Sequence, residues 1–228
     1  MAGERKPDHA EHRRRLRQRF LDGGSGALPD YELVELLLTM AIPRGDVKPA
    51  AKALMARFRT FDGVVNASVD DLRTVRGLGE VAPVAIKIVR AAADRLLQAE
   101  LQDRDILSSF DAVLAYCKAA MAFEQREAFR VLFLDRKNRL IADEELQKGT
   151  VDHAPVYPRE IARRALELGA TALILVHNHP SGDPTPSRAD ITMTAGIVAA
   201  LKAVDIVVHD HIVIARGGHS SLRTLGHL

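Results

Sequence analysis

Residues 170–190 read ATALILVHNHPSGDPTPSRAD, and no other stretch of the chain constrains its fold as strongly. The part up to His177 is almost continuously apolar, which is typical of a strand covered on both faces of a sheet. Proline and glycine then interrupt the run, and Ser187 is a typical N-cap residue for a helix that follows. The stretch therefore predicts a buried strand, a turn-rich loop and a helix.

Strand and helix patterns continue on both sides of this stretch. Strands are expected at 127–135, 139–150 and 206–215, with a further candidate at 151–158. A helix is expected to open at Pro158 and to stop at Gly169, because proline suits a first helical turn and glycine suits a C-terminal cap. The order of these elements predicts an α/β layer over the second half of the chain.

The first half of the chain has a different pattern. Up to about Leu101, apolar residues recur at helical spacing, as Leu33, Leu36 and Leu37 do. The polar segment QDRDILSSFD (102–111) then separates the two halves. We expect an α+β or α/β protein with two domains, a small all-helical domain over 1–102 and an α/β sandwich over 107–228.

The composition is that of a packed protein. Apolar residues make up 47% of the 228 residues, and no apolar run approaches the length of a bilayer span. The N-terminus lacks the apolar core of a signal peptide, so we expect a soluble, cytoplasmic protein without a membrane partner. The single cysteine, Cys117, excludes an internal disulfide and a cage of thiolate ligands.

The charge of the chain is small but uneven. The net charge of +2 argues against a protein that is basic throughout, as many nucleic-acid-binding proteins are. One short segment nevertheless holds a run of arginines: Arg13, Arg14, Arg15, Arg17 and Arg19. Such a run is either a solvated helix face or a contact surface for phosphate groups, and both interpretations stay open.

The loop after the apolar strand carries side chains suited to a metal ion. His177 and His179 are two residues apart, so their imidazoles point the same way at a strand end. The Pro- and Gly-rich loop could fold Asp190, in the first turn of the next helix, back toward them. Two imidazoles and a carboxylate can hold a catalytic zinc ion that keeps its fourth position for water. The alternative is a polar loop in which Ser187 and Asp190 only cap the helix.

Hydrolysis at such a site needs two further groups. A carboxylate must take a proton from the attacking water, and a donor must stabilise the developing oxyanion. Ser187, three residues before Asp190, is placed to donate. The carboxylate must come from elsewhere, and Glu144 and Glu145 in the strand expected at 139–150 are available.

The complete pattern, H-x-H-x7-S-x2-D, resembles the signature of the JAMM (MPN+) zinc metallopeptidases. Together with VYPREI upstream, HNHPSGDPTPSRAD is similar to the RadC branch of that family, whose members are called DNA repair proteins. The resemblance covers nearly the whole chain. HRRRLRQRFLDGG, LPDYELVELLL and AIPRGDVKPAAKAL look like the RadC N-terminal domain, and DAVLAYC onward looks like the JAMM domain.

The resemblance implies a fold and a ligand set. The fold is a JAMM-type α/β sandwich, with a curved sheet between helices that are layered as in cytidine deaminases. His177, His179 and Asp190 would hold one Zn2+ per chain, and Ser187 would assist the oxyanion. The implied reaction is zinc-dependent hydrolysis of an amide or isopeptide bond in an unidentified protein or peptide.

The resemblance also implies a general base. The family's essential glutamate falls on an E-x4-G stretch, which in this chain gives Glu144, five residues before Gly149. Glu145 stays open as the alternative. Adjacent strand residues face opposite sides, so only one of the two can point at the metal.

LRTVRGLGEVAPVAIKIV (72–89), within a segment of about 60–97, resembles a helix-hairpin-helix. Glycines in the turn would let backbone N–H groups reach a DNA phosphate, and nearby arginines would support the contact. The candidate DNA contacts are Gly77, Gly79, Arg76 and Arg73. A proline and a glutamate after the turn depart from the pattern, and the alternative is a hairpin that only packs.

A second H-x-H pair, His209 and His211, lies in the strand expected at 206–215 and has no third ligand at useful spacing. We expect a structural role for the pair. A position beside the metal site is the alternative for His211.

Two rival functions stay open. The same zinc site could attack a phosphodiester, which would make the protein a metal-dependent nuclease that the hairpin delivers to DNA. The protein could also be a non-catalytic adaptor in DNA repair or recombination. One metal with a single carboxylate ligand favours amide hydrolysis, since many nucleases use two metals held largely by carboxylates. The sequence predicts nothing about the oligomeric state.

Overall fold

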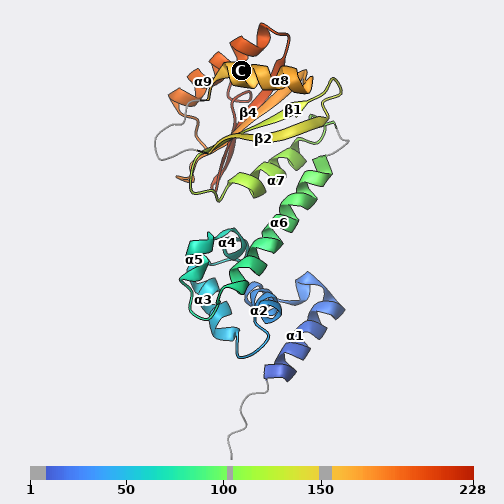
Figure 1. Ribbon diagram of the computed structural model, residues 1–228, viewed down its shortest axis with the longest axis vertical. Helices are drawn as coiled ribbons and strands as arrows, with labels where there is room; N and C mark the ends of the chain where they lie inside the picture. The colour runs from blue at the N-terminus through green and yellow to red at the C-terminus, as the bar shows by residue number, and fades with distance from the viewer. Residues whose placement is uncertain (1–8, 102–104, 149–155) are drawn as a thin grey trace, which may run out of the picture. The chain divides into compact units, whose positions relative to one another are not determined.

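The computed structural model describes residues 9–101, 105–148 and 156–228 (Figure 1). The chain forms two compact units, Met1–Ala92 and Ala93–Leu228, and the division falls inside a long helix. Among the described helices, none combines the length and the apolar character that crossing a membrane requires.

The described part of the first unit has helices and no strand, as the apolar spacing predicts. In chain order its elements are α1 (His9–Gly23), the short 3-10 helix η1 (Ser25–Ala27), α2 (Asp30–Ala41), α3 (Lys48–Phe58), α4 (Phe61–Asn66), α5 (Val69–Arg73) and the first part of α6 (Val81–Leu101). Leu38, Leu54, Leu72 and Ile86 are fully buried at the centre of this unit. Burial of these side chains from four helices holds the unit together.

The turn between α5 and α6 has the form of a helical hairpin. Gly77 and Gly79 have φ angles of 93° and 59°, in the left-handed region that favours glycine. Leu78 between them is buried in the helical core with 2% of its surface exposed. The two glycines therefore let the chain reverse direction, and the buried side chain of Leu78 holds the turn against the helical core.

The second unit contains a sheet with helices on both faces. Its elements are α7 (Phe110–Met121), β1 (Ala128–Leu134), β2 (Leu140–Lys148), α8 (Pro158–Leu168), β3 (Ala172–Asn178), α9 (Arg188–Lys202), β4 (Val207–Ala215) and β5 (Gly218–Ser221). The predicted strands at 127–135, 170–179 and 206–215 are confirmed, and the one at 139–150 is confirmed over its described residues. The candidate strand at 151–158 lies mostly outside the described residues, and 156–157 belong to no strand.

The five described strands form one mixed sheet in the order β2-β1-β3-β4-β5. β1 runs antiparallel to both β2 and β3, whereas β3 and β4 are parallel and are joined through α9. The hairpin partner of β4 is the short strand β5. β3 is therefore central, with hydrogen-bonded neighbours on both sides and buried residues along its whole length.

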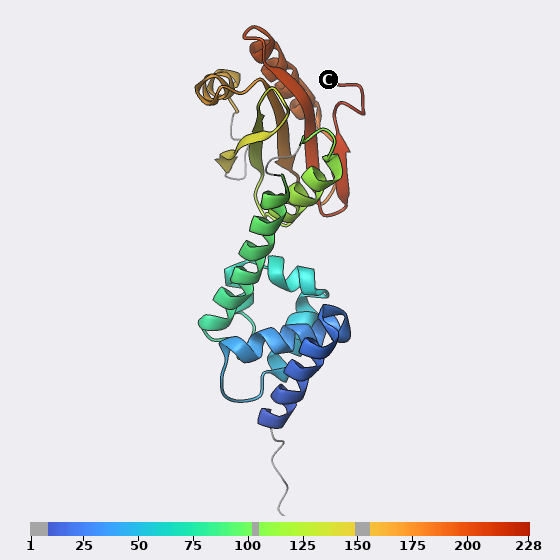
Figure 2. The ribbon, with the colours of Figure 1, turned by 90° about the vertical axis from the view of Figure 1, so that its right-hand side faces the viewer.

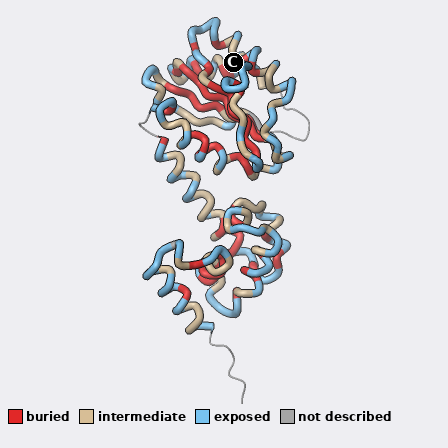
Figure 3. Tube along the Cα trace, turned by 180° about the vertical axis from the view of Figure 1, so that it is seen from behind, coloured by how far each residue is buried: buried red, intermediate tan, exposed pale blue. Residues whose placement is uncertain are grey.

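Helices cover both faces of the sheet (Figures 1 and 2), and an apolar cluster fills the space between each helix layer and the strands. α7 packs on one face, where Cys117 contacts the cluster that contains Leu132 and Ile174. α8 and α9 pack on the other face, around Phe133 and Leu175. Figure 3 shows that buried residues concentrate in the strands between these layers. The expected fold class, a helical region followed by a sheet between helices, is confirmed.

Helix α8 begins and ends at the residues that the sequence indicates. Pro158 occupies its first turn, and Gly169 forms its C-cap with a φ of 65°. The Gly169 N–H donates to the carbonyl of Leu166 at 3.1 Å. A left-handed residue at this position lets the chain leave the helix and enter β3 within three residues.

Replacing Gly169 by alanine tests this cap. No atom lies within 4 Å of the position that an alanine Cβ would take at Gly169 or at Gly196 in α9, so neither substitution creates a clash. Gly169→Ala is expected to lower the free energy of unfolding by about 1 kcal/mol, because the left-handed conformation is strained for alanine. Gly196→Ala, the matched control, is expected to raise it by about 0.5–1 kcal/mol. Urea denaturation measures both, and equal effects would contradict the cap.

Candidate metal centre

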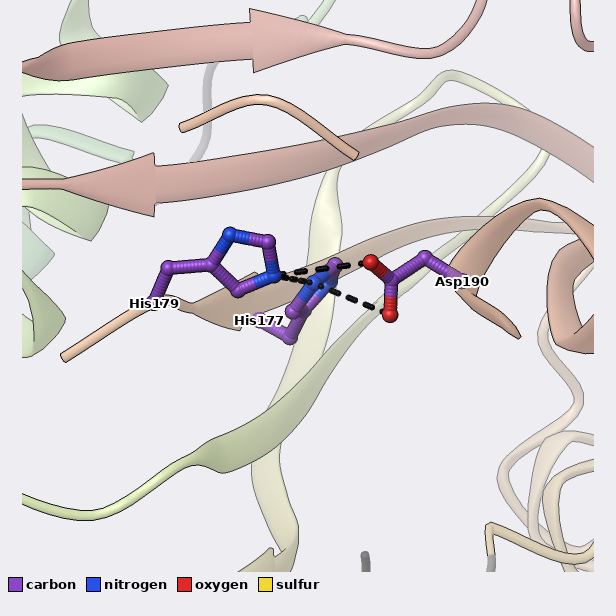
Figure 4. Close-up of side chains that lie close together, drawn as sticks. All are labelled: His177, His179 and Asp190. Atoms are coloured by element: carbon purple, nitrogen blue, oxygen red, sulfur yellow. Dashed lines mark hydrogen bonds and ion pairs between the residues drawn. The ribbon is translucent and has the colours of Figure 1, made fainter. Parts of the chain in front are cut away.

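Strand β3 and the residue after it place two histidines side by side (Figure 4). His177 is buried near the end of β3. His179 lies one residue past the strand, where its N–H donates to the Ile214 carbonyl at 2.8 Å and prolongs the contact with β4. The Nε2 atoms of the two rings are 3.0 Å apart. The two imidazoles thus converge, as side chains two residues apart in an extended chain should.

The loop after His179 brings a carboxylate to the two imidazoles. Asp190 lies in the first turn of α9. Its Oδ1 is 3.5 Å from His177 Nε2, and its Oδ2 is 3.4 Å from His179 Nε2 (Figure 4). Within residues 9–101, 105–148 and 156–228, this is the only group of three or more potential metal ligands with atoms this close together.

Ser187 and Asp190 also cap α9 reciprocally. Ser187 Oγ accepts from the Asp190 N–H at 3.2 Å, and Asp190 Oδ2 accepts from the Ser187 N–H at 2.7 Å. This capping box is compatible with a metal site, because it holds the Asp190 carboxylate beside the imidazoles. The Ser187 side chain is exposed, and its hydrogen bond with the Asp190 carboxyl contributes to the lowered pKa of Asp190. A ligand that receives a hydrogen bond from this hydroxyl would replace the carboxylate as its acceptor.

The hydrogen bonds at Nδ1 determine which nitrogen of each ring faces Asp190. His179 Nδ1 is 2.9 Å from the Asp183 carbonyl oxygen, which can only accept, so Nδ1 carries the hydrogen. His177 Nδ1 lies 2.8 Å from His211 Nε2 in the protein interior. Both rings therefore turn Nε2 toward one point in front of Asp190.

The charges at this point are those of a cation site. The Asp190 carboxylate raises the pKa of His179, against burial, which lowers it. Burial by itself would raise the pKa of Asp190, but the interactions with His177 and His179 hold that pKa well below its ordinary range. Two nitrogen lone pairs that converge at 3.0 Å repel each other unless a proton or a metal ion lies between them.

The donor set fits zinc. Two neutral imidazole nitrogens and one carboxylate give three protein ligands, and a catalytic zinc site keeps the fourth position for water or substrate. His177, His179 and Asp190 come from two rigid elements, the end of a buried strand and the first turn of a capped helix. Ligands on rigid elements hold a metal geometry more firmly than ligands on loops do.

Glu144 and Glu145, the two expected candidates for the base, point to opposite faces of the sheet. Glu144 pairs with Val131 and faces α8, where Arg164 binds its carboxylate through contacts of 2.6 to 3.0 Å. These hydrogen bonds from Arg164 lower the pKa of Glu144. Glu145 lies on the α7 face, 3.7 Å from the Arg130 guanidinium. The structure brings neither carboxylate into the group of His177, His179 and Asp190.

A third glutamate, Glu127, lies near the two histidines. The sequence alone does not point to it. It immediately precedes β1, in which Phe129 lies opposite His177. Continuing that register by two residues places Glu127 opposite His179, and opposite residues of an antiparallel pair share a face. The charge of Glu127 contributes to the raised pKa of His179. The pairing of β1 with β3 is the signal that identifies Glu127, and it is not visible in the sequence alone.

Asn178, between the two histidines, ties the Glu127 segment to the end of β3. Its side chain is buried, and its Oδ1 accepts from the Ala128 N–H at 2.8 Å. Its Nδ2 donates to the Arg126 carbonyl at 3.1 Å. Both partners flank Glu127 in the chain, so the tripeptide that carries the two imidazoles also positions the backbone on either side of this glutamate.

The arginine run in α1 is partly engaged within the helical unit. Arg13 donates to three backbone carbonyls in the 42–45 loop at 2.6 to 3.0 Å. Arg14 pairs with Glu11 at 2.9 Å, and Arg19 pairs with Glu32 at 2.8 Å. These contacts favour a structural or solvated role for much of the run, because each cation already has an acceptor.

The hairpin residues proposed to contact DNA lie together at the turn before α6. Gly77, Gly79, Arg73 and Arg76 are all exposed. Arg73 lies 3.5 Å from Asp70, in a pair whose partners are both largely exposed. Exposed pairs of this kind are weak, so the guanidinium can exchange this partner for another anion.

Comparison with known proteins places the chain in a family. The model of the RadC-like JAB domain matches residues 107–227, which hold all the residues of the candidate metal centre. The chain is also 55% identical over 218 residues to a UPF0758 protein of Ruegeria pomeroyi, which covers 96% of this chain and 97% of that relative. The name of that relative states no activity. Both findings show that the chain belongs to the RadC-like JAB domain family.

Proposed function

We propose that the protein is a zinc-dependent hydrolase that cleaves an amide or isopeptide bond in a protein or peptide. The observation that carries this proposal is the convergence of His177 Nε2, His179 Nε2 and the Asp190 carboxylate in front of a buried strand end. When bound there, zinc supplies Lewis acidity, which lowers the pKa of a water molecule toward neutrality and polarises a carbonyl group. Membership of a JAB-domain family is consistent with a hydrolase.

We assign the general base to Glu127, in place of the expected Glu144. The strand register puts Glu127 opposite His179, whereas Glu144 lies level with Leu175, two residues before His177, and is bound by Arg164. Glu127 would take a proton from the attacking water and later deliver it to the leaving amine. Its exposure lets it meet both solvent and substrate.

Ser187 has the complementary role of a donor. Its hydroxyl oxygen already accepts the Asp190 N–H, which fixes the side chain at the N-terminus of α9. The hydroxyl hydrogen would then donate to the oxygen of the scissile carbonyl as negative charge develops on it. The positive end of the α9 dipole lies at the same place and favours the same charge.

The ligand set supports amide hydrolysis over phosphodiester cleavage. The described residues hold one candidate metal cluster, with a single carboxylate. Many nucleases use two metals about 4 Å apart, held largely by carboxylates. A nuclease would show metal-dependent cleavage of labelled DNA that His177→Ala abolishes.

Metal analysis tests the centre directly. The protein purified from zinc-supplemented cells is expected to hold about one zinc per chain, and the His177→Ala/His179→Ala variant to hold almost none. The matched control removes two other histidines of the same sheet, as His209→Ala/His219→Ala, and should keep the metal. A wild-type protein without zinc in elemental analysis would overturn the proposed function.

The assignment of the base is tested by comparing two glutamates. To find a substrate, a protein mixture is treated with the enzyme, the newly formed amino groups are labelled, and the labelled peptides are identified by mass spectrometry. With that substrate, Glu127→Gln is expected to lower kcat by about 100-fold or more while the zinc content is unchanged. Glu144→Gln should change kcat by less than about tenfold, since it removes an ion pair with Arg164 that is partly exposed. The reverse ranking would restore Glu144 as the base.

A second proposal concerns the helical unit, which we infer binds DNA through the turn between α5 and α6. Gly77 and Gly79 turn the backbone, and the N–H groups of these two residues make no hydrogen bond with the described part of the chain. Arg73 and Arg76 lie beside them and are exposed. Backbone N–H groups before a long helix can donate hydrogen bonds to a DNA phosphate, and nearby cations strengthen the contact. Contacts to phosphate do not depend on the base sequence of the DNA.

Salt dependence tests DNA binding. For a DNA duplex of arbitrary sequence, Arg73→Ala/Arg76→Ala should weaken binding and reduce the slope of log K against log salt by about 1–2. The control, Arg159→Ala/Arg163→Ala, removes the same charge from α8 and should leave the slope unchanged. Wild-type protein that does not bind the duplex at about 50 mM salt would refute the proposal.

A further inference from the structure

His211 is the inner residue of the second H-x-H pair, and it lies directly behind the metal cluster. It is fully buried on β4, opposite Leu175 of β3. Its Nε2 is 2.8 Å from His177 Nδ1, and its Nδ1 is 2.6 Å from Thr194 Oγ1. Both ring nitrogens therefore have a partner inside the protein, and one of these partners is a candidate zinc ligand.

Thr194 fixes the direction of these hydrogen bonds. It lies one helical turn after Asp190 on α9, and its Oγ1 donates to the Asp190 carbonyl at 2.6 Å. A hydroxyl has only one hydrogen, so Thr194 Oγ1 must accept from His211 Nδ1. The His211 ring then carries its hydrogen on Nδ1, which leaves Nε2 as an acceptor in the neutral form.

The chain of donors continues to the cluster. Because His211 Nε2 accepts, His177 Nδ1 must donate its hydrogen across the 2.8 Å contact. The remaining nitrogen of a neutral His177 ring, Nε2, then has a free lone pair that points at Asp190. The opposite tautomer of His177 would put a hydrogen on Nε2 and block coordination by that atom.

We propose that His211 and Thr194 form a hydrogen-bond relay that fixes the tautomer and the ring orientation of His177 and so raises the zinc affinity of the site. The relay runs from His177 through His211 and Thr194 to the backbone carbonyl of Asp190, so it starts and ends at proposed ligands. His211 is thus a positioning residue that acts through His177. This inference deepens the proposed function and rests on it for the identity of the metal.

The surroundings of His211 suit such a role. Phe129 packs edge-on against the ring with 5.6 Å between centroids. The backbone N–H of His211 is bound by Asp210 Oδ1 at 2.7 Å. The ring is therefore enclosed by the protein, with Phe129 beside it and hydrogen-bond partners at both nitrogens.

His209, two residues earlier on the same strand, provides a matched comparison. Its Nε2 contacts Asn138 Oδ1 at 2.8 Å, in the turn between β1 and β2. It is half-buried and is not a member of the group formed by His177, His179 and Asp190. A substitution at His209 therefore changes the same residue type on the same strand without touching the relay.

Zinc affinity, measured by competition with a chromophoric chelator, tests the relay. His211→Leu, which leaves the His177 Nδ1–H without an acceptor, should weaken zinc binding by about 10- to 100-fold. His211→Gln should recover most of the affinity, since its amide oxygen can accept the same hydrogen. Thr194→Val should also weaken binding, and His209→Gln should not. A folded His211→Leu protein with wild-type zinc affinity would overturn the proposal, because a purely structural histidine would alter only the thermal stability.

Imidazole nitrogen NMR of the zinc-free wild-type protein tests the tautomers without any variant or metal. Neutral His177 and His211 should both carry their hydrogen on Nδ1. A hydrogen on His177 Nε2 overturns the relay even if His211→Leu does not fold. Absence of zinc from the wild-type protein would defeat the proposed function instead, and the tautomer measurement would still decide whether the relay exists.

Discussion

The groups that surround the two histidines of the candidate centre depend on the pairing of β3 with its two neighbours. β3 is buried along its whole length and is hydrogen-bonded to β1 on one side and to β4 on the other. The first pairing brings Glu127 level with His179, and the second brings His211 behind His177. A slip of one residue in either register would turn these side chains to the α7 face of the sheet.

Local sequence patterns predicted most of the elements of the second unit and the three metal-ligand candidates. Pro158, Gly169 and Ser187 mark helix ends by their backbone chemistry, and this chemistry acts within a few residues. The strand β5, with the sequence GHSS, was not predicted, because it has no apolar run and depends on β4 for its pairing. The clustering of His177, His179 and Asp190 could be predicted because one strand and one loop bring them together.

Groups whose surroundings depend on distant pairings are the ones that local sequence patterns specify least. A short local pattern points to Glu144, whereas Arg164 from α8 binds its carboxylate. The sequence makes Glu127 the first residue of an expected buried strand, and only the antiparallel partner of that strand shows which residues lie opposite it. The relay through His211 likewise joins β4, β3 and α9, three elements whose contact no local spacing encodes.

The capping box formed by Ser187 and Asp190 couples the first turn of α9 to the candidate centre. Asp190 holds the first turn of α9 through the Ser187 N–H while its carboxylate faces the imidazoles. Folding of α9 and occupation of the centre are therefore thermodynamically linked, and a bound cation would strengthen the helix end that presents one of its ligands. A substitution at Asp190 removes charge and helix cap together, whereas one at His177 leaves the cap intact.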